Sequence, residues 1–174
     1  MIRIALLVPA LAALTACTSV GQIPTAKIAG ATLRQANGTP AGTVIVTAAG
    51  DKLTLSLAAA GLPIGAHGAH LHMVGRCDGP DFASAGGHLN PGAKRHGALN
   101  PAGSHTGDLP NLSIDSNGAG TLSVELSGTR SELEAVLFDA DGTALVIHAA
   151  PDDYKTDPTG NSGARIACGV LTRG

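Results

Sequence analysis

The sequence predicts an all-β protein, an eight-stranded Greek-key β-sandwich or flattened barrel. Three observations support this fold. Apolar and polar residues alternate with a period of two over several short segments, Gly, Pro or Asn ends these segments about every eight to twelve residues, and helix signals are almost absent. With 174 residues and only three aromatic side chains, we expect a single domain whose core consists of small aliphatic side chains on strands.

The first strands are expected before a long loop. The clearest is the segment 52–58, where Leu53, Leu55 and Leu57 alternate with other residues before a Gly-Leu-Pro turn that begins at Gly61. The other strands expected here are the segments 29–34, 43–48 and 68–74. A long segment from 75 to 110 then shows no periodicity. A loop of this length inside a compact domain is either functional or disordered, and a metal ion and a disulfide would order it.

Strands resume after the long loop. We expect them at 112–114, 120–126, 135–138 and 144–149, each short and followed by turn-forming residues. A second loop, 151–163, contains Pro, Gly and Asn. The segment 165–171 closes the chain as the last strand.

Residues 1–16 predict a bacterial lipoprotein signal peptide. Arg3 precedes an apolar run from Ile4 to Leu14 that is too short to span a bilayer, and small residues stand before Cys17. The end of this run, Leu-Thr-Ala-Cys, resembles a lipobox, which implies cleavage before Cys17 and lipidation of its thiol. Cleavage nearby as a plain signal peptide is the alternative.

The mature chain is expected in the bacterial envelope. Residues 17–25 are polar and predict a flexible tether between the lipid and a folded domain at 26–174. This predicts a periplasmic protein of a Gram-negative bacterium, anchored to the outer or the inner membrane, and Thr18 after the cysteine favours the outer one.

The charge pattern argues against other partners. The formal net charge is −2, and removal of residues 1–16 takes away Arg3 and leaves ten basic and thirteen acidic residues, or −3. Because the basic residues are scattered, we expect no nucleic-acid partner and no membrane contact except through the lipid.

Histidines gather in one stretch and predict metal binding. Six of the seven lie between residues 65 and 108. Neutral imidazole is the commonest metal ligand, and His70 and His72, one residue apart on a strand, face the same side and suit copper or zinc. Three imidazoles and a carboxylate form a tetrahedral zinc set, for which the candidates are His88, His96, His105 and Asp108. Asp108 in an ordinary turn is the alternative.

The remaining cysteines predict a disulfide. If Cys17 carries a lipid, Cys77 and Cys168 are an even pair in an oxidising compartment. Two unpaired buried thiols are the alternative.

Six sequence blocks resemble the copper/zinc superoxide dismutase family, and they extend over roughly residues 26 to 172. The blocks are GAHLH, SAGGHLNP, KRHG, SHTGDLPN, LVIH and DDYKTDPTGNSGARIACGV. The resemblance implies that His88 binds both metal ions and that a disulfide joins Cys77 to Cys168. It implies a copper set of His70, His72, His88 and His148, and a zinc set of His88, His96, His105 and Asp108.

The resemblance also implies roles around the metals. Asp152 is expected to accept hydrogen bonds from His70 and His96, although Asp153 is an alternative, and both could simply be solvated. Arg165 is expected to bind the anionic substrate, with a surface salt bridge as the alternative. His67 belongs to no metal set of the family. We expect its ring to form a hydrogen bond to the backbone behind the strand that carries His70 and His72.

The function implied is dismutation of superoxide to dioxygen and hydrogen peroxide, with one copper and one zinc ion per subunit and Arg165 and His88 as catalytic residues. Two other classes remain as alternatives. An envelope lipoprotein that buffers or delivers metals would need neither Arg165 nor an open copper position. A structural β-sandwich with a decayed site would lack ligands. The sequence leaves monomer and homodimer open.

Overall fold

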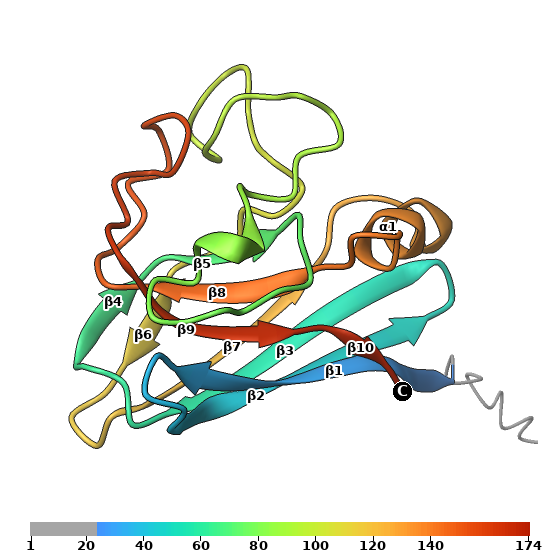
Figure 1. Cartoon of the computed structure of the whole chain (residues 1–174). Helices are drawn as coiled ribbons and strands as arrows, with labels where there is room; N and C mark the ends of the chain where they lie inside the picture. Colours follow the sequence, from blue (N-terminus) through green and yellow to red (C-terminus); the bar gives the residue numbers. More distant parts are fainter. Residues whose placement is uncertain (1–23) are drawn as a thin grey trace, which may run out of the picture.

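The structure, a computed structural model, describes residues 24–174 as ten strands, one α-helix and one 3-10 helix (Figure 1). The strands are β1 (Thr25–Gln35), β2 (Pro40–Ala49), β3 (Lys52–Ala60), β4 (Gly65–His67), β5 (Ala69–His72), β6 (Leu112–Ile114), β7 (Ala119–Glu125), β8 (Ala144–His148), β9 (Arg165–Val170) and β10 (Thr172–Arg173). The helices are η1 (Ala83–Ala85) and α1 (Arg130–Leu137). Within residues 24–174, no helix has the length and apolar character needed to cross a membrane.

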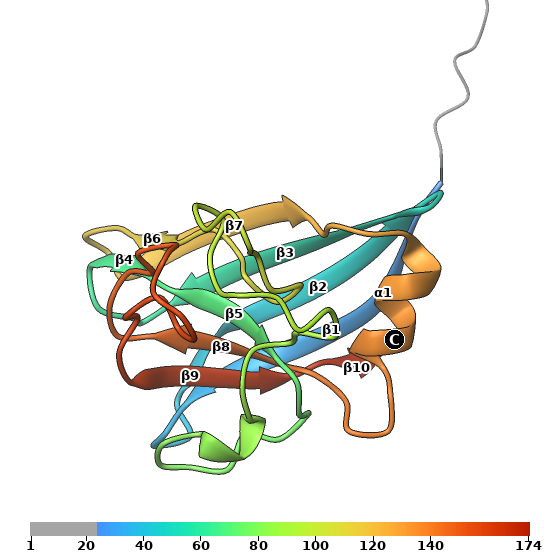
Figure 2. The same ribbon diagram turned by 90° about the horizontal axis from the view of Figure 1, so that it is seen from above.

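One antiparallel sheet forms most of the domain. Its order is β5-β8-β9-β1-β2-β3-β7, and β10 also pairs with β1. The sheet curls, as the two perpendicular views show (Figures 1 and 2). The short strands β4 and β6 pair with each other and lead along the chain toward β5 and β7, the two edge strands. The predicted all-β Greek-key fold is confirmed, with one short helix added.

The core lies on the inner face of the curled sheet. In β3, Leu53, Leu55 and Leu57 are at most 2% exposed, as their period of two predicted. Val46 and Val44 of β2 lie opposite Leu55 and Leu57 and are buried with them. Because burial of one such side chain contributes about 1.5–3 kcal/mol, this alternation directs each strand's apolar face inward.

β8 is covered on both faces. Leu145 and Ile147 belong to the main core, while Ala144 and Val146 pack outward against Phe82 and Ala85 of the long loop. All five residues of β8 are therefore buried, including His148 at its end.

The expected strand at 135–138 is wrong, because this segment belongs to α1 and its C-terminal cap. Thr129 caps the helix: its side chain accepts from the backbone of Glu132, and the Glu132 carboxylate accepts from the backbone N–H of Thr129. Leu133 and Leu137, four residues apart, are the buried side chains. The Thr-x-x-Glu spacing was the signal that could have identified this helix.

Other strand boundaries also differ from expectation, and the short strand β10 was not predicted. β1 begins at Thr25, which was expected to be the last residue of the tether. The expected strand at 68–74 is shorter, and Gly68 separates β5 from β4, which was not predicted. The long loop contains one regular element, η1. Residues 1–16 and Cys17 lie outside the described residues.

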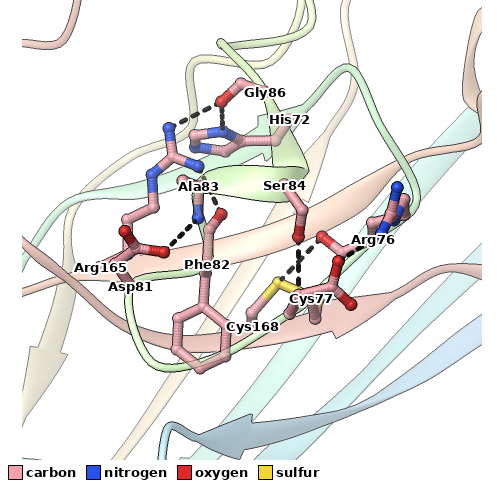
Figure 3. The surroundings of a disulfide bond; sticks show 11 residues. His72, Arg76, Cys77, Asp81, Phe82, Ala83, Ser84, Gly86, Arg165 and Cys168 are labelled. Carbon is pink, nitrogen blue, oxygen red and sulfur yellow. Dashed lines mark hydrogen bonds and ion pairs between the residues drawn. A yellow bond between two sulfur atoms is a disulfide. The ribbon is translucent and has the colours of Figure 1, made fainter.

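A disulfide joins the long loop to β9, as predicted. Cys77 and Cys168 are 91 positions apart in sequence, and their Cα atoms lie 5.7 Å from each other. The bond lies beside the segment from Asp81 to Gly86 (Figure 3). A cross-link over so long a loop removes much of the freedom of the unfolded chain.

Replacing both Cys77 and Cys168 with Ala should lower the free energy of unfolding by about 2–5 kcal/mol, because the unfolded chain regains the entropy of the open loop. Urea unfolding of the metal-free protein, followed by far-UV circular dichroism, measures the change. A loss below about 1 kcal/mol would show that the packing around Phe82 holds the loop without the cross-link.

Candidate metal centre

The edge of β5 that does not pair with β8 positions the residues of the site. One edge of β5 pairs with β8, and the long loop supplies backbone partners for the other. Leu71 N donates to Gly107 O over 2.9 Å, and Leu89 N donates to Leu71 O over 2.8 Å. These bonds set Asp108 opposite His70 and His88 opposite His72. Residues far apart in sequence are thus placed beside β5 by main-chain hydrogen bonds.

Gly107 is required by this close approach. A Cβ atom at this position would overlap with the carbonyl oxygen of Leu71 and crowd the backbone N of Leu89. Since only glycine lacks a Cβ, the loop can lie against β5 here without being displaced. The glycine in SHTGDLPN is thus needed for packing, next to the ligand candidate Asp108.

The first histidine cluster contains the four residues expected to bind copper. Their candidate ligand atoms lie within 4.8 Å of one another, and all four residues are buried. The ring centroids of His72 and His148, which come from distant parts of the chain, are 5.7 Å apart. The cluster consists of His70, His72, His88 and His148.

In each ring of this cluster one nitrogen is buried without a hydrogen-bond partner. The other nitrogen of all four rings has a partner: His70 Nε2 bonds Asp152, His72 Nδ1 bonds Gly86 O at 2.9 Å, His148 Nδ1 bonds Gly163 O at 3.1 Å, and His88 Nδ1 bonds Asp108 Oδ1 at 3.0 Å. Bonds of this kind fix the tautomer and direct the free lone pair toward a metal. The unpartnered atoms are His70 Nδ1, His72 Nε2, His88 Nε2 and His148 Nε2.

The second cluster surrounds one oxygen of Asp108. The Nδ1 atoms of His88, His96 and His105 lie 3.0, 3.1 and 3.2 Å from Asp108 Oδ1. Three imidazoles and a carboxylate with convergent donor atoms fit a tetrahedral zinc ion. His88 belongs to both clusters, with Nδ1 in this one and the unpartnered Nε2 in the other.

A buried carboxylate joins the two clusters. Asp152 Oδ2 accepts from His70 Nε2 at 2.8 Å, and Asp152 Oδ1 accepts from His96 Nε2 at 2.9 Å. Asp153 instead accepts from Thr156 and from Asn161 within its own loop. Of the two carboxylates considered from the sequence, Asp152 is the one that contacts the histidines.

Two residues that the sequence reasoning missed hold this region together. Asn111 clamps the backbone of Asp152: its Oδ1 accepts from Asp152 N at 2.8 Å and its Nδ2 donates to Asp152 O at 2.9 Å. Asp157 Oδ1 accepts from the backbone N of His96 at 2.6 Å and lies 3.9 Å from His105 Nε2. Asn111 ends the block SHTGDLPN, which was a signal for it. Asp157 lies in the block DDYKTDPTGNSGARIACGV, but the sequence does not reveal its contact with His96, because that contact crosses between two loops.

Burial keeps several of these histidines neutral. It lowers the pKa of His72 to about 2, of His88 to about 4 and of His148 to about 3, although hydrogen bonds to Gly86, Asp108 and Gly163 oppose the change. A histidine with a lowered pKa is uncharged at pH 7 and can offer a lone pair to a metal.

The two carboxylates stay ionised. Burial alone would raise the pKa of Asp108, but hydrogen bonds from His88 and Gly97 hold it below its usual value. Burial acts in the same direction on Asp152, and hydrogen bonds from His70, His96 and the Tyr154 backbone lower its pKa. Both side chains are therefore acceptors at neutral pH.

Arg165 lies next to the first cluster. Its guanidinium donates to Phe82 O at 2.6 Å and to Gly86 O at 2.7 Å, and Gly86 O also accepts from His72 (Figure 3). Burial lowers the pKa of Arg165, while nearby Asp81 raises it. The side chain forms no salt bridge among the described residues, so its charge is held by carbonyl groups.

His67 lies outside both clusters, as expected. Its Nδ1 and Nε2 are each 2.8 Å from a backbone oxygen, of His148 and Pro63 respectively. The ring thus ties the turn before β4 to the end of β8, behind the copper candidates.

Comparisons with known proteins agree with this geometry. The family model described as copper/zinc superoxide dismutase (SODC) matches residues 40–171. The chain is 50% identical over 120 residues to Superoxide dismutase (Cu-Zn) 1 of Aquifex aeolicus (strain VF5), which covers 67% of this chain and 71% of that protein. It is 44% identical over 147 residues to Superoxide dismutase (Cu-Zn) of Caulobacter vibrioides (strain ATCC 19089 / CIP 103742 / CB 15), covering 81% and 83%.

A solved structure shares the fold. The crystal structure of a SOD-like protein from Bacillus subtilis superposes with a TM-score of 0.78 at 36% identity, over 84% of this chain and 100% of that one. Together with the paired clusters of buried donor atoms, these similarities show that the chain belongs to the copper/zinc superoxide dismutase family and is an oxidoreductase whose cofactors are copper and zinc.

Proposed function

We propose that this protein converts superoxide to dioxygen and hydrogen peroxide in the bacterial envelope, at a copper ion joined to a zinc ion through His88. The observation that carries the proposal is a set of four buried imidazole nitrogens that have no hydrogen-bond partner. The candidate ligand atoms of these four histidines lie within 4.8 Å of one another. In the proposed site His70, His72, His88 and His148 hold copper, and His88, His96, His105 and Asp108 hold zinc.

Two features support the bridging role of His88. Its Nδ1 lies among the zinc candidates, 3.4 Å from His105 Nδ1, and its Nε2 belongs to the copper candidates. A ring that is buried and uncharged can lose its remaining proton between two cations. When bound, copper supplies the one-electron redox couple that zinc lacks.

In this proposal, side chains of the protein transfer the proton and bind the substrate. In the proposed cycle His88 takes up a proton at Nε2 from water in the first half-reaction and donates it to the departing peroxide in the second, and water supplies the other proton of hydrogen peroxide. Arg165 attracts and orients each superoxide anion, because its guanidinium is a fixed cation held against Phe82 O and Gly86 O. Asp152 keeps His70 and His96 in one orientation throughout.

A metal-buffering lipoprotein is the competing function. Such a protein would need the two histidine clusters, but it would not need a cation held next to the copper candidates. Arg165 shares Gly86 O with the copper candidate His72, and this shared carbonyl favours catalysis over storage.

His88→Ala should lower kcat/KM for dismutation by about 100-fold or more, since the bridging group and the proton it carries are lost together. Three candidate ligands for each ion remain, so the variant should still bind metal. Dismutase assays with metal analysis of the copper- and zinc-loaded protein test this, and Arg95→Ala, an exposed change in the same loop, is the control. Full activity of the loaded His88→Ala variant would refute the proposed site.

Arg165→Glu should slow dismutation about tenfold or more at low ionic strength and weaken or reverse its dependence on salt, because the anion then meets a negative charge. Arg165→Lys should retain more of the rate. The matched control is Arg76→Glu, the same charge change at a side chain that is 66% exposed. Equal effects of the Arg165 and Arg76 changes would rule out a local role for Arg165.

Cys17→Ser should release the protein from the membrane fraction, since the proposed anchor is a lipid on this thiol. Fractionation of cells that express the full chain, with detection of the protein in soluble and membrane extracts, measures the shift. Unchanged fractionation would favour another route of processing and would leave the metal site untouched.

A further inference from the structure

A cavity opens beside the zinc candidates. Its volume is about 270 Å³, and it lies between residues 103–109 of the long loop and residues 124–127 at the end of β7. In Figure 2 this part of the loop, drawn in yellow-green, passes over β7. Two of the four proposed zinc ligands, His105 and Asp108, are in its wall.

Among the zinc candidates, the side chains of these two residues are the more exposed. The side chains of His105 and Asp108 are 6% and 4% exposed, while those of His88 and His96 are 1% and 0% exposed. The residual opening of the zinc cluster therefore coincides with the two residues that line the cavity.

The opening at Arg165 is a different one. The cavity there is lined by Pro80, Asp81, Ala83, Gly163, Ala164 and Arg165, and it shares no residue with the first. None of these residues is a zinc candidate. His88 belongs to both clusters and Asp152 joins them, so a zinc ion that entered past Arg165 would have to cross the copper candidates.

The two openings also differ in charge. The Arg165 opening holds one cation, the guanidinium of Arg165, and one anion, the carboxylate of Asp81, so these two charges balance there. The cavity next to the zinc candidates has two carboxylates, Asp108 and Glu125, against one cation, Lys94, and it is also lined by hydroxyl groups such as those of Ser104 and Ser127. Glu125 also pairs with Lys52 over 3.0 Å. Hydroxyl and carboxylate oxygens can replace water around a hydrated cation as it moves inward.

We propose that this cavity is the passage through which zinc enters and leaves its site, separate from the opening used by superoxide. The inference rests on the proposed zinc set. A passage acts on the rates of uptake and release together, so narrowing it slows both and leaves the equilibrium affinity unchanged. A substitution that only disturbs the ligands would change the affinity.

Ser127 is the position to test, because it lines the cavity and is exposed. In the full chain, Ser127→Ala, Ser127→Leu and Ser127→Trp form a series of increasing size. Zinc release to a coloured chelator, uptake of zinc by the metal-free protein and the zinc Kd are measured for each. Ser127→Trp should slow uptake and release about tenfold, which corresponds to roughly 1.4 kcal/mol on the barrier, and Ser127→Ala should not.

The matched control is Ala164→Trp, which places the same bulk at the exposed rim of the Arg165 opening. It should leave zinc exchange unchanged. Equal rates across the Ser127 series, slowing by Ala164→Trp alone, or a change in Kd without parallel changes in both rates would each overturn the proposal that zinc uses this passage.

A separate variant, His105→Ala, tests the zinc set itself. If this variant binds zinc as tightly as the unchanged chain, the proposed function and the proposed passage both fail.

Discussion

The site depends on the pairing of one edge of β5 with the backbone of the long loop. β5 lies at the end of the main sheet, so its outer N–H and C=O groups need partners. Residues 87–89 and 107–109 supply them. Each such bond contributes only about 0.5–1.5 kcal/mol, but leaving a buried group without a partner costs more. The loop is thereby held in one register, and its ligand candidates lie next to His70 and His72.

A second set of contacts locks the other loop onto the first. Asp152 is buried between His70 and His96, and a buried carboxylate is stable only when its oxygens accept hydrogen bonds. The clamp from Asn111 fixes the backbone of Asp152, and Asp157 binds the backbone of His96. The loop 151–163 therefore reaches both histidine clusters without contributing a residue to either.

The disulfide and Arg165 attach the segment 77–86 of the long loop to β9, next to the copper candidates. Cys77 is bonded to Cys168 of β9, and Arg165, at the start of the same strand, holds the carbonyls of Phe82 and Gly86. Gly86 O also accepts from His72. A displacement of Gly86 would consequently move Arg165 and the copper candidate His72 together, because both side chains donate to its carbonyl oxygen.

The sequence by itself determined the fold class and most of the strands, and its resemblance to a known family named the residues that form both histidine clusters. Alternation such as Leu53, Leu55 and Leu57 is a local signal, and ligand types at family-like spacings are readable along the chain. The segment 135–138 was predicted wrongly, because its four apolar residues suit either a strand or a helix, and the cap at Thr129 favoured the helix. The short strands β4 and β10 were not predicted.

Only the tertiary structure decided which groups meet across loops. It distinguished Asp152 from Asp153, added Asn111 and Asp157, set the tautomers of the histidines through bonds to Gly86 and Gly163, and separated the opening at Arg165 from the cavity at His105. The physical reason is that two long loops without periodicity carry no local record of their partners. Their course is set by backbone pairing with β5, by the disulfide and by buried hydrogen bonds, all of which join residues that are distant in sequence.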